Sequence, residues 1–115
     1  MSKKNEKVEE IKKLLEDLDK KVLGEATEKV EEFIESLGTI RDAIDELKVE
    51  YEDKVANIEE YFPNGNKATE SLNDKIEKAE ELFDKMEEII STIEEAKESL
   101  TEQLSEIESF SIEEL

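Results

Sequence analysis

Sixteen apolar side chains follow one another from Val8 to Phe62, each three or four residues after the last. Their fifteen steps cover 54 residues, an average of 3.6, which is the period of a straight α-helix. Because this spacing is helical and not the alternation of a strand, it predicts an all-α fold. The series comprises Val8, Ile11, Leu15, Leu18, Val22, Ala26, Val30, Phe33, Leu37, Ile40, Ile44, Leu47, Tyr51, Val55, Ile58 and Phe62.

The strongest interruption of the helical pattern is the segment of residues 62–66, which contains the sole proline, Pro63, followed by Asn64 and Gly65. Proline cannot continue a helix, and Asn-Gly favours a turn with positive φ. After it, apolar residues between Leu72 and Ile93 recur with a strict four-three spacing, as in a coiled coil. We therefore predict a long, coiled-coil-like antiparallel hairpin, with helices at about residues 3–61 and 67–108.

Two glycines leave the division of the first half open. A bend at Gly24 would let residues 3–23 fold back and form a three-helix bundle, and residues 37–42 around Gly38 also resemble a helix end followed by a new start. A glycine inside a helix costs only about 1 kcal/mol. Because the apolar series keeps its phase through both, we favour the hairpin, in which the longer first helix overhangs the second and leaves apolar surface bare.

The domain organisation expected from this pattern is simple. We expect residues 1–108 to form a single helical domain and residues 109–115 to form an acidic-hydrophobic C-terminal tail. The beginning of the chain lacks the apolar run of a signal peptide, and no window resembles a membrane span. With no cysteine, a cytoplasmic location is expected. Arginine occurs once among 16 basic residues, a bias typical of AT-rich genomes such as those of some phages.

Charge and residue types argue against several classes of function. A net charge of −19 should repel nucleic acid phosphates and anionic lipid, so no direct nucleic acid or membrane partner is expected. The chain has no histidine and no cysteine, which removes the usual proton-transfer groups and nucleophiles. Its many paired carboxylates fit a solvated helix face better than a catalytic cleft or a metal site. We therefore predict no enzyme activity, no cofactor and no metal site.

Two places could instead bind a protein. Tyr61 and Phe62 put two aromatic side chains at the tip of the predicted hairpin, where they either cap the core or form a docking knob. The C-terminal stretch carries further apolar anchors among acids, and it is either a frayed helix end or a short docking peptide. These anchors are Ile107, Phe110, Ile112 and Leu115.

The function predicted from the sequence is that of a non-enzymatic interaction protein. Two helices cannot fully cover both apolar stripes, so the chain should self-associate, most simply as a homo-oligomer, or bind a protein partner. Such a protein could act as an assembly scaffold, an adaptor or a chaperone-like factor. Two alternatives stay open. In one, the acidic surface mimics DNA and blocks a nucleic-acid-binding protein; in the other, the helices are a spacer and the C-terminal peptide docks on a partner.

Overall fold

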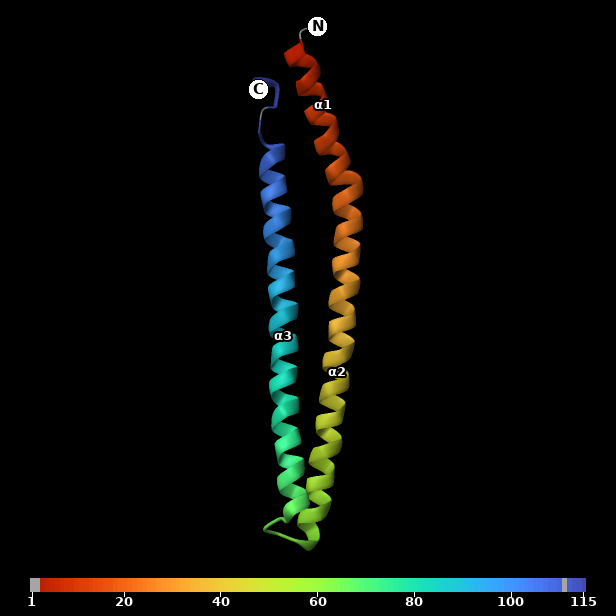
Figure 1. Ribbon diagram of the computed structural model, residues 1–115, viewed down its shortest axis with the longest axis vertical. Helices are drawn as coiled ribbons and strands as arrows, with labels where there is room; N and C mark the ends of the chain where they lie inside the picture. Colours follow the sequence, from red (N-terminus) through yellow and green to blue (C-terminus); the bar gives the residue numbers. More distant parts are fainter. Residues whose placement is uncertain (1–2, 111) are drawn as a thin grey trace. The chain divides into compact units, whose positions relative to one another are not determined.

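The computed structural model describes residues 3–110 and 112–115, and Met1, Ser2 and Ser111 lie outside the described residues. The helices are α1 (Lys3–Asp17), a five-residue π-helix η1 (Leu18–Val22), α2 (Leu23–Tyr61), α3 (Lys67–Glu108) and a short 3₁₀ helix η2 (Ile112–Glu114) (Figure 1). The described ranges contain no strand. The predicted all-α helical hairpin is confirmed.

The helical backbone continues through both glycines of the first half. Gly24 and Gly38 lie inside α2, and the residues that flank η1, Asp17 and Leu23, have right-handed helical φ and ψ angles. The chain therefore does not bend at Gly24, and the alternative of a third helix made by residues 3–23 is wrong. The helix continues because a glycine inside it costs only about 1 kcal/mol, whereas a bend would break backbone hydrogen bonds of the helix.

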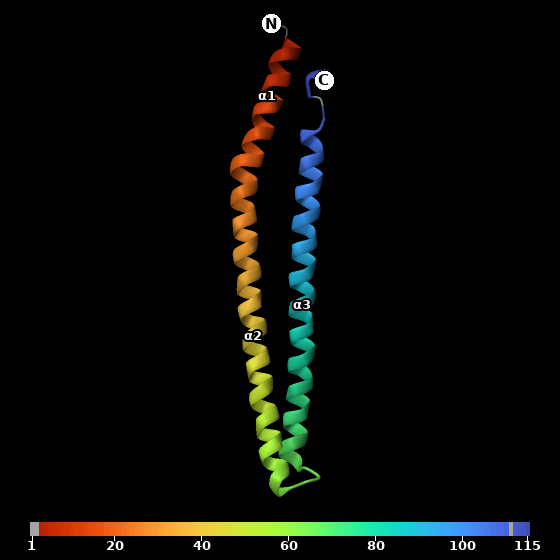
Figure 2. The same cartoon turned by 180° about the vertical axis from the view of Figure 1, so that it is seen from behind.

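The chain forms two compact units. The turn unit comprises Ile34–Thr92, and the terminal unit comprises Met1–Phe33 with Ile93–Leu115. Each contains a stretch from the first half of the chain and a stretch of α3. In the turn unit, α2 and α3 run side by side in opposite directions and are joined by the turn (Figures 1 and 2). The division into one helical domain and a separate tail stays a prediction.

The turn is held by backbone and side-chain hydrogen bonds. The Phe62 N–H donates to the Ile58 carbonyl at 2.9 Å, and the Gly65 N–H donates to the Phe62 carbonyl at 2.7 Å. Gly65 has a φ of 78°, which only glycine adopts without strain. Asn66 caps α3, because its Oδ1 accepts the Thr69 N–H at 3.1 Å. In return, the buried Thr69 Oγ1 accepts the Asn66 N–H at 2.8 Å.

The seam between the helices of the turn unit is thin and follows a heptad. Its apolar centre is provided by Val55, Ala79 and Ile90, which are buried, and by neighbours that are half-buried. Successive seam residues alternate steps of three and four, an average of 3.5, as in a left-handed coiled coil. The seam residues are Leu37, Arg41, Ile44, Lys48, Tyr51, Val55 and Ile58 on α2, and Thr69, Leu72, Ile76, Ala79, Phe83, Met86 and Ile90 on α3.

The terminal unit contains the π-helix η1. The half-buried positions Leu23, Thr27 and Val30 of α2 keep the heptad spacing, but continuing it backwards through a regular helix would turn Glu16 and Glu9 inward. In the structure, Leu15 and Val8 point inward instead, each one residue before Glu16 and Glu9 in the sequence. A π-helix absorbs one extra residue, so η1 brings the apolar side of α1 into phase with Leu23, Thr27 and Val30 of the same unit.

The C-terminal tail takes part in the packing of the terminal unit. η2 lies against α1 (Figure 1), and Ile112 is half-buried there. On α3, Lys97 Nζ lies 2.8 Å from Glu31 Oε1 of α2. The overhanging apolar surface of the first helix is therefore covered in part by the tail. Within the described residues, no helix is both apolar enough and long enough to cross a membrane.

Candidate functional site: the apolar flank of the turn unit

Two basic residues occupy seam positions of α2 that the 3.6-residue pattern assigns to apolar neighbours. Arg41 and Lys48 are half-buried, with 28% and 27% of their side chains exposed, whereas Ile40 and Leu47 are more exposed. Ile40 and Leu47, two members of the apolar series from Val8 to Phe62, therefore lie outside the seam. From Leu37 to Tyr51 the apolar series also fits a heptad, but the heptad of Tyr51, Val55 and Ile58, continued backwards, turns Lys48 and Arg41 inward instead.

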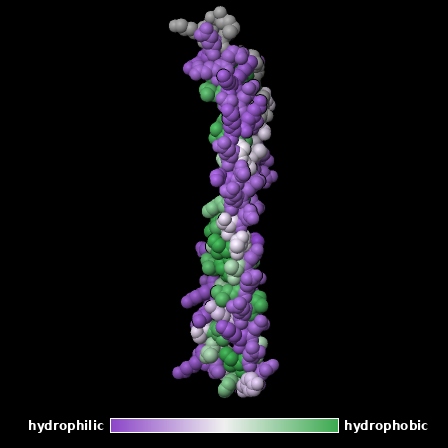
Figure 3. Space-filling model, turned by 90° about the vertical axis from the view of Figure 1, so that its right-hand side faces the viewer, coloured by the Kyte–Doolittle hydropathy of each residue, from purple (hydrophilic) through white to green (hydrophobic). Residues whose placement is uncertain are grey.

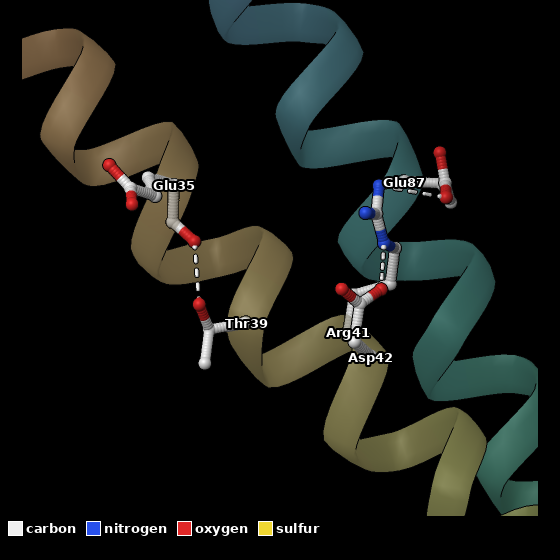
Figure 4. A network of polar contacts seen from close by, with 5 residues as sticks. All are labelled: Glu35, Thr39, Arg41, Asp42 and Glu87. Atoms are coloured by element: carbon white, nitrogen blue, oxygen red, sulfur yellow. Dashed lines mark hydrogen bonds and ion pairs between the residues drawn. The ribbon is translucent and has the colours of Figure 1, made fainter.

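Both seam cations reach across to α3. Arg41 Nη1 lies 3.1 Å from Glu87 Oε1 (Figure 4), and Lys48 Nζ lies 3.5 Å from Glu80 Oε1. Lys48 is seven residues after Arg41 on α2, and its partner Glu80 is seven residues before Glu87 on α3. The ion pairs fix the antiparallel register of the helices, and they place Glu80 and Glu87 on one side of the seam.

The side chain of Arg41 is held by two carboxylates. It donates a hydrogen bond from Nε to Asp42 Oδ1 at 3.2 Å and another from Nη1 to Glu87 (Figure 4). These contacts raise the pKa of Arg41 above its ordinary value, the hydrogen bond to Asp42 having the largest effect, although partial desolvation acts in the opposite direction. Arg41 is therefore cationic at neutral pH.

The displaced aliphatic residues gather on the other side of the seam. Ile40 and Leu47 directly precede the seam residues of α2, and Leu82 and Ile89 directly precede seam residues of α3. These four side chains, which we call the apolar flank, are exposed by 47%, 43%, 47% and 42%. Figure 3 shows hydrophobic side chains at the surface in the half of the molecule that holds the turn.

A contact around Tyr51 shows that both rows lie on the same side of the turn unit. Lys54 comes seven residues after Leu47 on α2, and Lys75 comes seven residues before Leu82 on α3. Their ammonium groups lie 5.8 Å and 5.7 Å from the centroid of the same Tyr51 ring. The two rows therefore converge at this ring, and the antiparallel register places Leu47 beside Leu82 and Ile40 beside Ile89.

The aromatic pair predicted at the tip is exposed. Tyr61 is 81% exposed and Phe62 is 54% exposed, so neither caps the core in the way that a buried aromatic would. Tyr61 comes seven residues after Lys54, on the same row of α2 as the apolar flank. Binding of a partner through Tyr61 and Phe62 stays a prediction.

The four predicted anchors of the C-terminal stretch are divided by the structure. Ile107 and Ile112 line a cavity of about 360 Å³ in the terminal unit, together with Leu15, Leu18 and Leu104. Phe110 and Leu115 point to solvent, with exposures of 74% and 59%. Ile112 is half-buried and Ile107 is 38% exposed, and a role of all four residues in binding a partner stays a prediction.

Acidic residues are plentiful, but the described ones are dispersed. Nowhere in residues 3–110 and 112–115 do three or more carboxylates come close enough together to hold a metal ion. Two carboxylates of α3, Glu80 and Glu87, are engaged by seam cations.

The sequence contains a signal for the apolar flank that the 3.6-residue pattern hides. The four-three spacing recognised on α3 between Leu72 and Ile93 predicts the seam of α3 correctly. A heptad continued backwards along α2 from Tyr51, Val55 and Ile58 would place Lys48 and Arg41 in the seam and leave Leu47 and Ile40 outside.

Comparison of the chain with protein-family models, with curated proteins and with solved structures finds no match.

Proposed function

We propose that this chain is a non-enzymatic interaction protein that binds another polypeptide through the apolar flank and acts as an assembly scaffold, an adaptor or a chaperone-like factor. The observation that carries the proposal is the exposure of Ile40, Leu47, Leu82 and Ile89, each above two fifths, although the hairpin of the turn unit is closed. Aliphatic side chains arranged in a continuous strip on a charged surface mark a site of association.

The composition of the helices supports the same proposal. A helix that packs against a single partner needs apolar residues in two positions of the heptad, whereas a helix in a larger bundle has a third apolar row beside them. The apolar flank adds such a row to both α2 and α3. The turn unit thus has the pattern of helices that pack against more than each other.

The proposal is tested by a variant of the apolar flank and a matched control. Leu47→Glu with Leu82→Glu places charge in the middle of the flank, and Val49→Glu places charge at a side chain that is 47% exposed but outside the flank. We expect circular dichroism to show unchanged helicity in both. Affinity capture from the native host should show a bound partner for the wild type and for Val49→Glu, and none for the double variant. Sedimentation velocity applies the same comparison to any self-association.

Association that survives in the double variant would contradict the proposal. So would a wild-type chain that binds neither itself nor any host protein over a concentration range that includes the micromolar.

A further inference from the structure

Lysines outnumber acids around the apolar flank, although the molecule as a whole is acidic. On a helix surface, residues three and four positions apart are neighbours. The outer neighbours of Leu82 and Ile89 on α3 therefore include Lys78 and Lys85, and Lys54 and Lys75 extend the same rows toward the turn. The corresponding outer neighbours on α2 are Ser36, Ala43 and Glu50, of which only Glu50 is charged.

This surface is basic although the chain has a net charge of −19. All four lysines are exposed. Among the described residues, none of them has a carboxylate within 4.0 Å, although acids stand four positions before three of them: Glu50, Asp74 and Glu81. Lys54 and Lys75 lie over the Tyr51 ring instead. Their positive charges are thus available to a molecule that covers the flank.

We propose that the apolar flank binds an acidic amphipathic helix of another protein, a step that rests on the function proposed above. Ile40 and Leu47 on one helix and Leu82 and Ile89 on the other form a strip along the seam, which suits a third helix lying in the groove between α2 and α3. Its apolar side would cover the four aliphatic residues. Its carboxylates would lie beside Lys78 and Lys85 along α3, and beside Lys54 and Lys75 toward the turn.

Charge complementarity selects this occupant over a second copy of the chain. Packing two apolar flanks against each other would bring eight lysines and two glutamates to one interface, and like charges placed together disfavour association. An acidic helix would instead neutralise the lysines. The carboxylates on the far side of the molecule repel an acidic partner, but at about 0.15 M salt the Debye length is about 8 Å, so this distant repulsion is largely screened.

The test uses the full chain and two synthetic helical peptides of equal length. Both carry leucine at the same helical positions; one has glutamate and the other has lysine at the remaining charged positions. Fluorescence anisotropy at about 0.15 M salt should show binding of the glutamate peptide. Lys78→Glu with Lys85→Glu should weaken that binding at least about tenfold. The control Lys7→Glu with Lys13→Glu makes the same change of charge in α1 and should leave binding unaltered.

The other outcomes separate this inference from the proposed function. Equal binding of both peptides, or equal effects of the two lysine variants, would overturn the acidic partner while leaving the flank as a binding surface. A dimer in sedimentation velocity that Leu82→Glu abolishes, without binding of the glutamate peptide, would make the flank an interface between copies and would also overturn the inference. If neither peptide nor a second copy binds, the inference fails, and affinity capture from the host with the Leu47→Glu, Leu82→Glu variant then decides the proposed function.

Discussion

Ile89 and Ile90 are neighbours in the sequence, but only Ile90 should contribute strongly to the stability of the turn unit. Ile90 is 7% exposed in the seam, whereas Ile89, in the apolar flank, is 42% exposed. Ile90→Ala removes buried methyl groups and leaves a cavity, so we expect the free energy of unfolding to fall by about 2–3 kcal/mol. Ile89→Ala should cost less than about 1 kcal/mol. Urea unfolding followed by circular dichroism measures the free energy of unfolding of both variants. Equal losses would contradict the assignment of Ile90 to the seam and Ile89 to the surface.

Two glycines should respond to alanine with opposite signs. Gly65 has a φ of 78°, and a Cβ added there would lie 2.5 Å from Thr69 Oγ1, which binds the N–H of Asn66. Gly65→Ala should therefore lower the free energy of unfolding by about 1–3 kcal/mol. At Gly24, inside α2, an added Cβ meets nothing within 4 Å. Gly24→Ala should therefore raise the free energy of unfolding by up to about 1 kcal/mol. Thermal unfolding of the two variants checks the signs, and destabilisation by Gly24→Ala would indicate a bend that needs glycine.

At the scale of elements, the π-helix η1 can be tested by shortening it. Because η1 accommodates one extra residue, deleting Lys20 should give a regular helix and still turn Val8 and Leu15 to the same side as Leu23 and Val30. We expect an unchanged or higher thermal midpoint. Deleting Glu32 instead, within the regular part of α2, should turn the preceding residues by about 100° relative to those that follow and misplace Leu23 and Val30. Circular dichroism melts should show a lower midpoint for this control alone.

The elements themselves could be predicted because their signals are local. Pro63, Asn64 and Gly65 define the turn, and α3 begins at Lys67 and ends at Glu108, where the apolar pattern places it. The identity of the seam residues on α2 could not be read from α2 alone. Ile40 and Arg41 both lie near the inner side of an isolated helix, and only the supercoil with α3 selects Arg41. The π-helix likewise arises from the mismatch between α1 and the heptad, a property of packing and not of residues 18–22.

The candidate site was predicted less well than the fold. The seam cations and the apolar flank depend on which residue of each adjacent pair turns inward, so an error of one residue hides both. Tyr61, Phe62, Phe110 and Leu115 are exposed, in agreement with surfaces that could bind, but their binding is not tested by the structure. Ile112 shows the limit of a sequence pattern, because the same acidic and hydrophobic alternation that suggests a docking peptide also lets η2 pack on α1.

At the scale of the whole molecule, the net charge of −19 sets how stability responds to salt. Two opposing effects are present: salt screens the repulsion among 35 acidic residues, and it also weakens ion pairs such as those of Lys48 and Lys97. These ion pairs are partly exposed, and such pairs contribute little. The repulsion, in contrast, involves many charges at distances up to the Debye length, which is about 30 Å at 0.01 M salt.

Screening of the repulsion should therefore dominate, and we expect the thermal midpoint at pH 7 to rise between about 0.01 M and 0.5 M sodium chloride. A matched variant replaces six exposed acids outside the apolar flank by their amides, at Glu46, Asp53, Glu60, Glu77, Glu81 and Glu88. This variant lowers the net negative charge by six while keeping every ion pair between the helices, so its midpoint should start higher and rise less with salt. A midpoint that falls with salt in both proteins would instead show that the ion pairs of Arg41, Lys48 and Lys97 outweigh the repulsion.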